Sequence, residues 1–348
     1  MKLVRFSVPG ATPEPAPGPG GARFGWVRGH EVVSFERAST VRGGTPPELA
    51  GVEAWLAALP GSLVLARSVA QSYGDAAADS ALAAVRIHPP VPRPPALFDF
   101  GLSPRHLRRS ALTLIRHEWG PIARACLVPW LALAERRLRR SAAMPYYKGN
   151  HNAVIGDGDS MGWPAYTSYL DIEPELAVIA GTESMPIAGY TILNDASARD
   201  VQMPEMFGSG PARSKDFDHS KGLGPFLVTP DEIPDPLVLD VRVRVGERFD
   251  WHGSTREYTK TPEDVIRHLR KILSVLPGTV VGMGTIPDCT GLDHDTWIRP
   301  GEGISIHFDR LGTLHQQVPA APANRSASRW RSRRDLGEEA TTASMPSA

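Results

Sequence analysis

Short segments rich in β-branched residues fill the chain from Tyr146 to about Val318, and they limit the possible folds more than any other feature. Segments such as ELAVIAG, GPFLVTP and LVLDVRVRVG are bounded by Gly, Pro or Asp, as strands between turns are. Glycine and proline contribute 33 residues each, 66 of the 348 in all, and supply the turns that such strands need. The pattern predicts a β-roll, sandwich or barrel of mixed type.

The rest of the chain divides around this region. Residues 1–87 mix strand and helix patterns and are expected to form a small N-terminal α+β module. The segment 88–95, HPPVPRPP, is predicted to be a stiff linker. Residues 96–318 would form the main domain, with a helical insert at about 104–142 whose arginines are expected on a solvated face. The polar tail, 319–348, is expected to be disordered.

Charge and hydropathy exclude several classes of partner. The 38 Lys and Arg residues balance 38 Asp and Glu residues, which argues against a nucleic-acid or membrane-surface binder. No segment reaches the roughly 18 apolar residues of a membrane span, and the N-terminus lacks the apolar core of a signal peptide. Cys126 and Cys289 give no disulfide framework. We therefore expect a cytoplasmic protein with no nucleic-acid or membrane partner.

An acidic strand is the first candidate for chemistry. In the run LDIEPELAV, Glu173 and Glu175 are two residues apart, as are Asp171 and Glu173, so in a strand all three would share one face. Neighbouring carboxylates repel each other, and oxygen ligands on a stiff scaffold suit a hard divalent cation. An exposed acidic edge strand is the alternative, and Pro174 is compatible with an edge.

Two further clusters follow a strand or a linker. The run NDASARDVQ, from Asn194 to Gln202, comes after an apolar strand; its Asp195 is either a site residue or part of an Asx turn or helix cap. Asp99 and His106 lie after the proline-rich segment, where a strand is expected to lead into a helix. Taken alone, His106 could equally be a structural histidine.

Together these clusters resemble the fumarylacetoacetate hydrolase family from about Asp99 to Val318, with a looser match before it. Five ordered matches carry the resemblance: Asp99 seven residues before His106, the D-x-E-x-E run, the N-D-x-S-A-R-D-x-Q turn, Lys215 with Gly224-Pro225 after it, and Pro277 to Thr285. The resemblance implies an α+β, mainly β fold, a mixed β-roll that usually pairs into a homodimer.

The resemblance also implies a divalent metal ion: Mg, Mn or Ca. Its ligands would be the four matching carboxylates, Asp99, Glu173, Glu175 and Asp195. Four carboxylates bring more negative charge than one such ion offsets, and Lys215 and Arg199 are the expected cationic neighbours. A small dicarbonyl substrate would bind the ion through two oxygens.

The implied reaction is hydrolysis of a carbon–carbon bond in a β-dicarbonyl or acylpyruvate-type substrate. His106 would be the general base on water, because the pKa of a histidine lies near working pH. Lys215 would stabilise the enolate. The remaining residues would contact substrate: Arg199, Gln202, Gly284 and Thr285.

The chain departs from the family pattern at the residue that should orient His106. Some members have Glu three residues after the histidine, where this chain has Arg109. Glu302 and Glu118 are possible substitutes. The departure leaves open a metal-dependent decarboxylase, tautomerase or hydratase of a 2-oxo acid, and also a non-catalytic scaffold.

Overall fold

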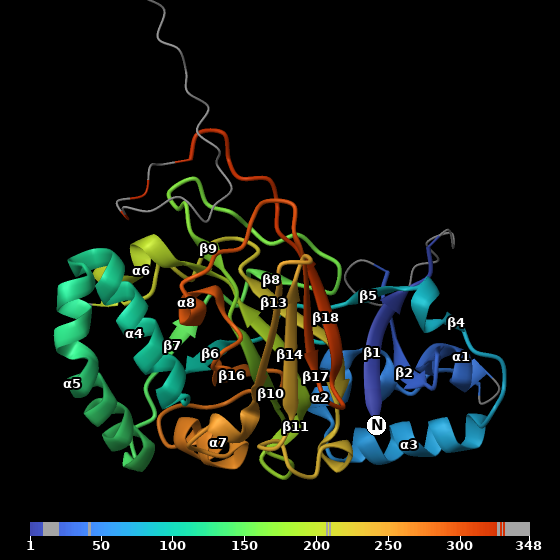
Figure 1. The fold of residues 1–348 in the computed structure, drawn as a ribbon. Helices are drawn as coiled ribbons and strands as arrows, with labels where there is room; N and C mark the ends of the chain where they lie inside the picture. Colours follow the sequence, from blue (N-terminus) through green and yellow to red (C-terminus); the bar gives the residue numbers. More distant parts are fainter. Residues whose placement is uncertain are drawn as a thin grey trace, which may run out of the picture.

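A large twisted sheet forms the centre of the molecule (Figure 1). The computed structural model describes residues 1–9, 21–40, 43–206, 208, 210–325, 328 and 330. The strands of this sheet run in the order β4-β3-β2-β1-β13-β11-β10-β16-β6-β7, with β5 beside β1 and β8 beside β13. Their bounds are β1 Lys2–Ser7, β2 Arg23–Arg28, β3 Glu31–Ser34, β4 Ser80–Ala81, β5 Arg86–His88, β6 Leu97–Phe100, β7 Tyr146–Gly149, β8 Val154–Ile155, β10 Pro174–Ala180, β11 Ile187–Asp195, β13 Lys221–Val228 and β16 Val280–Thr285.

The described part of the chain also contains two smaller sheets, eight α-helices and four short 3-10 helices. A four-stranded sheet has the order β15-β14-β17-β18, and β9 pairs with β12. The strands are β9 Leu170–Asp171, β12 Ser197–Ala198, β14 Asp240–Val245, β15 Phe249–Ser254, β17 Gly303–Phe308 and β18 Gly312–Gln317. The helices are α1 Phe35–Ser39, α2 Val52–Ala57, α3 Gly61–Tyr73, α4 Pro104–Trp119, α5 Pro121–Arg140, α6 Arg199–Met206, α7 Pro262–Arg270 and α8 Gly291–His294.

The central strands are buried on both faces. In β10, Leu176 and Val178 belong to the core shared with the four-stranded sheet, whereas Ala177 and Ile179 face the core under α2 and α3. This alternation follows from the two-residue period of a strand, and it explains why β10 has an unbroken apolar run. The α+β class expected from the sequence is confirmed, with about 30% helix and 29% strand.

The N-terminal strands continue the same sheet. β1 pairs antiparallel with β13, with Lys2 opposite Val228 and Leu3 opposite Leu227. The proline-rich segment leads from β5 to β6, and the carbonyl of Pro89 in it accepts a hydrogen bond from Arg5 at 2.9 Å. The division of the chain into domains at this segment stays a prediction.

The helical stretch expected at 104–142 forms the α4–α5 hairpin at one end of the molecule, on the left in Figure 1. Gly120 joins the two helices with φ of +93°, a backbone conformation that glycine adopts without strain. The arginines of α4 are partly exposed, as the sequence suggested, and they also pair with acidic residues of other elements. Arg105 lies 2.7 Å from Asp288, and Arg116 pairs with Asp295.

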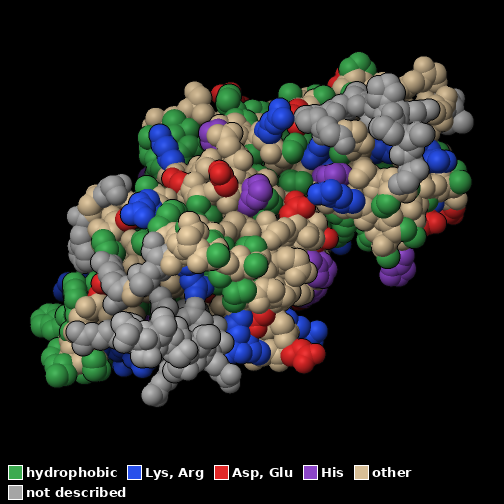
Figure 2. All heavy atoms as spheres, turned by 90° about the horizontal axis from the view of Figure 1, so that it is seen from above, with side chains coloured by type: hydrophobic (Ala, Val, Ile, Leu, Met, Phe, Trp, Pro, Cys, Tyr) green, Lys and Arg blue, Asp and Glu red, His purple; other side chains and the backbone are tan. Residues whose placement is uncertain are grey.

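The surface agrees with the balanced charge of the chain. Seen from above, acidic, basic and apolar side chains are interspersed over the described part of this face (Figure 2). None of the described helices combines the length and the apolar character that crossing a bilayer requires.

Trp330 differs from the disorder expected for residues 319–348. It is 3% exposed, its ring centroid lies 4.7 Å from that of Tyr169, and its indole N–H donates to Glu118 at 3.0 Å. It also stacks on His117 of α4 at 4.4 Å. Residues 331–348 lie outside the described residues, so the expectation stays untested there.

We expect Trp330→Ala to lower the free energy of unfolding by about 3 kcal/mol, because it removes a buried indole and leaves a cavity. Chemical denaturation of the full chain measures this. Trp130→Ala is the matched control, since Trp130 is 67% exposed and its loss should cost about 0.5 kcal/mol or less. Equal effects of the two changes would contradict the packing described for Trp330.

Candidate metal centre

Four buried carboxylates converge at the ends of neighbouring strands. Asp99 lies in β6, Glu175 in β10 and Asp195 at the end of β11, and Glu173 directly precedes β10. Each offers one oxygen, and these four oxygens all lie within 4.8 Å of one another. An all-oxygen donor set of this kind suits a hard divalent cation.

A glycine between the strands makes room for this approach. β16 separates β6 from β10 and places Gly282 opposite Asp99. A Cβ at Gly282 would overlap the Oε2 atom of Glu175 and lie 3.1 Å from the Oδ1 atom of Asp99. The absence of a side chain there lets the two carboxylates share the space above β16.

Three buried cations offset part of the negative charge. Lys215 pairs with Asp195 at 2.6 Å and also with Glu173. Lys221 pairs with Asp195, and Arg199 pairs with Glu173 and with Asp171, the latter at 2.8 Å.

The charged groups in and around the cluster have a net negative charge that one divalent ion could neutralise. They consist of five carboxylates, Asp99, Asp171, Glu173, Glu175 and Asp195, and three cations, Arg199, Lys215 and Lys221. Five negative charges against three positive ones leave two negative charges, which a single divalent cation would neutralise. Burying uncompensated charge is costly, so the fit is electrostatic as well as geometric.

The pKa values of the carboxylates are shifted in two opposite directions. Burial and the nearby Asp195 raise the pKa of Glu175 to about 8, and burial and Glu175 raise the pKa of Asp99 well above its usual range. Burial also opposes ionisation of Glu173, but Arg199 and Lys215 lower its pKa to about 2. Without a metal ion, Glu175 therefore keeps a proton at neutral pH, and burial beside Glu175 disfavours ionisation of Asp99.

His106 lies in the first turn of α4, at the edge of this cluster. Its Nε2 atom is 3.8 Å from Glu173, and its Nδ1 atom is 3.0 Å from the Oδ1 atom of Asp293. Asp293, in α8, has no exposed side-chain surface and also accepts the backbone N–H of Asp288 at 2.9 Å. The histidine therefore has a carboxylate partner on the side away from the cluster.

Asp293 is the carboxylate that contacts His106, whereas the sequence left the choice open between Glu302 and Glu118. Glu302 pairs with Arg248 at 2.5 Å, and Glu118 accepts a hydrogen bond from Trp330. Asp293 lies on an element far from His106 in the chain, so no local spacing marks it.

Three of the four residues expected to bind substrate line the cavity, and the fourth does not. Gln202, Gly284 and Thr285 line the cavity beside the carboxylates. The Gly284 N–H and the Thr285 hydroxyl both donate to Glu175, at 3.0 and 3.3 Å, so they also hold that carboxylate. Arg199 is fully buried and does not line the cavity, and its bonds to Asp171 and Glu173 favour a positioning role over substrate contact.

Asp171 lies outside the four-carboxylate cluster, although the strand periodicity placed it beside Glu173. β9 ends at Asp171 and β10 begins at Pro174, so the alternation does not continue from one to the other. The Asp171 carboxylate instead accepts the backbone N–H groups of Gly291 and Leu292, each at 2.9 Å.

Two further residues of the site, Tyr147 and Lys221, were not predicted from the sequence. Tyr147 donates its hydroxyl proton to Asp195 at 2.6 Å, and Lys221 lies 3.2 Å from the same hydroxyl. A lysine at the head of the buried strand KGLGPFLV was a usable signal, since buried lysines are almost always paired.

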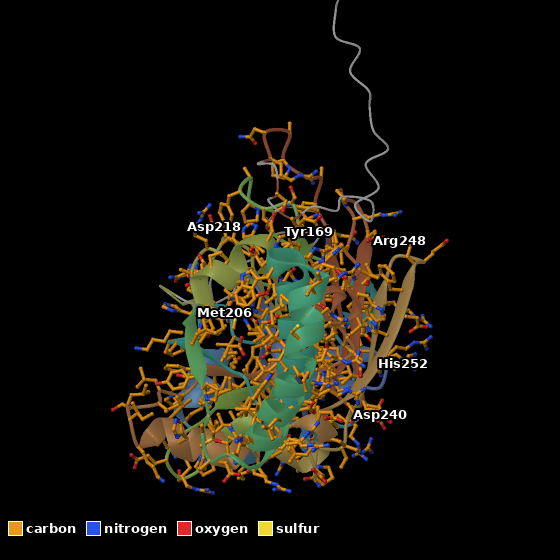
Figure 3. The ribbon with its side chains drawn as sticks, turned by 60° about the vertical axis from the view of Figure 1, so that its left-hand side comes forward. Tyr169, Met206, Asp218, Asp240, Arg248 and His252 are labelled. Carbon is orange, nitrogen blue, oxygen red and sulfur yellow. The ribbon has the colours of Figure 1, made fainter. Side chains whose placement is uncertain are left out.

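A cavity of about 560 Å³ opens over the carboxylates. Asp99, Glu173, Glu175, His106 and Lys215 lie at its polar end, and side chains from α4, α5 and α6 form its walls. Figure 3 brings the α4–α5 hairpin to the front, with Met206 of α6 beside it.

Sequence comparison identifies the family of this chain. The sequence model of the C-terminal domain of fumarylacetoacetate hydrolases matches residues 132–319, more than half of the chain. The chain belongs to the fumarylacetoacetate hydrolase family. The family and the fold inferred from the sequence motifs are thereby confirmed.

Two curated relatives match about half of this chain. A putative hydrolase from Burkholderia ambifaria is 31% identical over 179 residues, 48% of this chain and 62% of the relative. A human mitochondrial oxaloacetate tautomerase is 30% identical over 177 residues, 48% of this chain and 56% of the relative. The matched region thus spans less than two thirds of either relative.

Solved structures of similar fold cover nearly the whole chain. The maleylpyruvate hydrolase of a Sphingobium species, solved with manganese(II) and pyruvate, aligns with a TM-score of 0.64 and 20% identity over 92% of this chain and 100% of its own. A fumarylacetoacetate hydrolase from Exiguobacterium antarcticum aligns with a TM-score of 0.64 and 21% identity over 92% of this chain and 99% of its own. At these identities the comparison establishes the fold.

We expect binding of a divalent cation to release protons at pH 7. The ion must displace the proton that Glu175 holds below its pKa of about 8, so each proton released weakens the apparent affinity about tenfold per pH unit as the pH falls below that value. Calorimetry in two buffers of different ionisation enthalpy counts the protons. Glu175→Gln should reduce the count by about one, and a release of none by the unmodified protein would contradict the assignment.

We expect Gly282→Ala to weaken metal affinity about 10- to 100-fold, because the added methyl group displaces the Glu175 carboxylate. Isothermal titration with Mn²⁺ measures the change. Gly303→Ala is the control, since a Cβ there meets nothing nearer than 3.7 Å. Equal affinities for the two variants would show that Glu175 is not a ligand.

Proposed function

We propose that this protein is a divalent-metal-dependent hydrolase that cleaves a carbon–carbon bond in an acylpyruvate-type substrate. The observation that carries the proposal is the His106–Asp293 pair at the edge of the four-carboxylate cluster, in which His106 lines the cavity. In this position His106 would serve as a general base beside a substrate carbonyl group held at the cluster. We also propose that the protein acts as a cytoplasmic homodimer, as the family resemblance implies.

The metal ion would be held by Asp99, Glu173, Glu175 and Asp195. Magnesium is the first candidate, and manganese or calcium is compatible with the same oxygen donors. When bound, the ion supplies Lewis acidity that polarises a carbonyl oxygen. The manganese(II) and pyruvate in the Sphingobium maleylpyruvate hydrolase support both the ion and the 2-oxo acid head group.

Asp293 and His106 would together prepare the attacking water. The Asp293 carboxylate assigns the imidazole proton to Nδ1, which leaves Nε2 free to accept a proton. Nε2 points toward the cluster, and the Ser110 hydroxyl lies 3.1 Å from it. His106 takes a proton from water as the water oxygen adds to the acyl carbonyl carbon.

Collapse of this adduct breaks the bond between the acyl carbon and the neighbouring methylene carbon. The acyl part leaves as a carboxylic acid, and the electron pair of the broken bond forms the enolate of pyruvate. Lys215 lines the cavity with its charge next to Glu173 and Asp195 and stabilises the enolate oxygen. The proton held on His106 then returns to the methylene carbon, so that atoms and charge balance.

A tautomerase of 2-oxo acids is the second candidate. The 30% identity to a human oxaloacetate tautomerase over 177 residues favours it, and the same carboxylates would serve it. Tautomerisation needs no attacking water, but it also needs a base to move a proton from carbon, which the His106–Asp293 pair would supply. Cleavage of an acylpyruvate is therefore the observation that separates the two reactions.

We expect His106→Ala to lower kcat for acetylpyruvate hydrolysis at least 1000-fold, because water loses its general base, while affinity for Mn²⁺ changes less than about threefold. Asp293→Asn should lower kcat about 100-fold and alter the acidic limb of the pH–rate profile. Absorbance of the enol form follows turnover, and chelation by EDTA should abolish it.

Glu302→Gln is the matched control for Asp293, because it removes a carboxylate that pairs with Arg248 instead of His106; its kcat should change less than threefold. Normal turnover by His106→Ala would refute the base assignment. Oxaloacetate keto–enol exchange without any acylpyruvate cleavage would favour the tautomerase.

A further inference from the structure

The cavity extends well beyond the carboxylates along α4. Leu107, Ala111, Ile115 and Trp119 follow each other at four-residue intervals and all line it, as residues on one face of a helix do. At about 1.5 Å per residue this stripe extends about 18 Å. His106 and Ser110 lie on the adjacent stripe of the same helix, so the base and the apolar wall belong to one rigid element.

The opposite walls are also apolar. Leu131 of α5 and Met203 and Met206 of α6 line the same space. Trp119 and Met206 are each more than half exposed, which places the apolar surface at the mouth as well as inside. Methionine adapts to ligands of irregular shape.

No cation is free in this part of the cavity among the described lining residues. Lys215 is held by Glu173 and Asp195. The arginines of α4 point to partners elsewhere: Arg105 and Arg109 to Asp288, Arg108 to Glu135 and Arg116 to Asp295. A second carboxylate on the substrate would therefore lose its water without gaining a partner.

We propose that the substrate has a neutral, apolar tail, an alkyl or aryl group seated between α4 and α6, in place of a second carboxylate. The inference rests on the proposed function for the dicarbonyl head and adds the chemical class of the remainder. A volume of about 560 Å³ lies within the range of sites that enclose ligands of drug-like size, which leaves room for a tail of several carbons.

Binding of 2-oxo acids to the Mn²⁺-loaded protein tests the tail without any turnover. The matched pair is 2-oxohexanoate and 2-oxohexanedioate, which share chain length and differ in the terminal carboxylate. We expect 2-oxohexanoate to bind at least about 100-fold more tightly. Across pyruvate, 2-oxobutanoate, 2-oxohexanoate and 2-oxooctanoate, affinity should rise up to about fourfold per methylene, measured by isothermal titration.

Met206→Arg should reduce the preference for the monoacid within the pair by at least about tenfold, because it adds a cation to the wall. Ile122→Arg adds the same charge on a residue that is 79% exposed and does not line the cavity, and it should leave the preference as it is. Equal or tighter binding of the dioate by the unmodified protein overturns the proposal.

These outcomes also distinguish a failure of this proposal from a failure of the proposed hydrolase function. Selective binding of the monoacid without cleavage of any acylpyruvate would refute the hydrolase and keep the apolar tail. Cleavage with a preference for carboxylate-ended acylpyruvates would keep the hydrolase and refute the tail.

Discussion

The mutual repulsion of buried carboxylates is the constraint on which the site depends. Asp99, Glu173, Glu175 and Asp195 lie within one small volume, in an interior where like charges repel strongly. The fold accommodates them by pairing them with Arg199, Lys215 and Lys221 and by leaving Gly282 without a side chain. Two negative charges remain without a cationic partner among these groups. A divalent cation bound there would therefore have a structural role in the centre as well as a chemical one.

Helix α4 connects this centre to the remainder of the cavity. One of its faces has His106, and the next has the apolar stripe. Its outer residues are tied to the segment from Asp288 to Asp295 by Arg105, Arg109 and Arg116, and the same segment supplies Asp293 to His106. Pairs of this kind contribute little individually at a surface, but several along one helix set its position.

The sequence predicted the parts of the site that depend on local order. The four carboxylates and His106 occur in motifs at strand ends and at a helix start, where spacing and the family resemblance both apply. Asp293 and the backbone partners of Asp171 come from α8, which follows β16 in the chain, so only the tertiary fold brings them to the site. Arg199 was recognised, but its full burial could not be read from a turn motif. In the same way, Trp330 lies in a segment of disordered-type composition and is fixed by three aromatic rings that come from distant positions.

The short segment from Asp288 to Asp295 has a consequence for how such an enzyme could change over time. Because this segment contacts both His106, the proposed proton acceptor, and the helix that shapes the cavity, a shift in its backbone would alter the rate of the proposed reaction and the choice of substrate together. Variation there would produce coupled changes that improve one property at the expense of the other. Substitutions on α6, which contributes Met203 and Met206 to the opposite wall, can reshape the cavity while leaving the proton acceptor in place. New substrate ranges would therefore arise more readily on the α6 side of the cavity than on the side held by this loop.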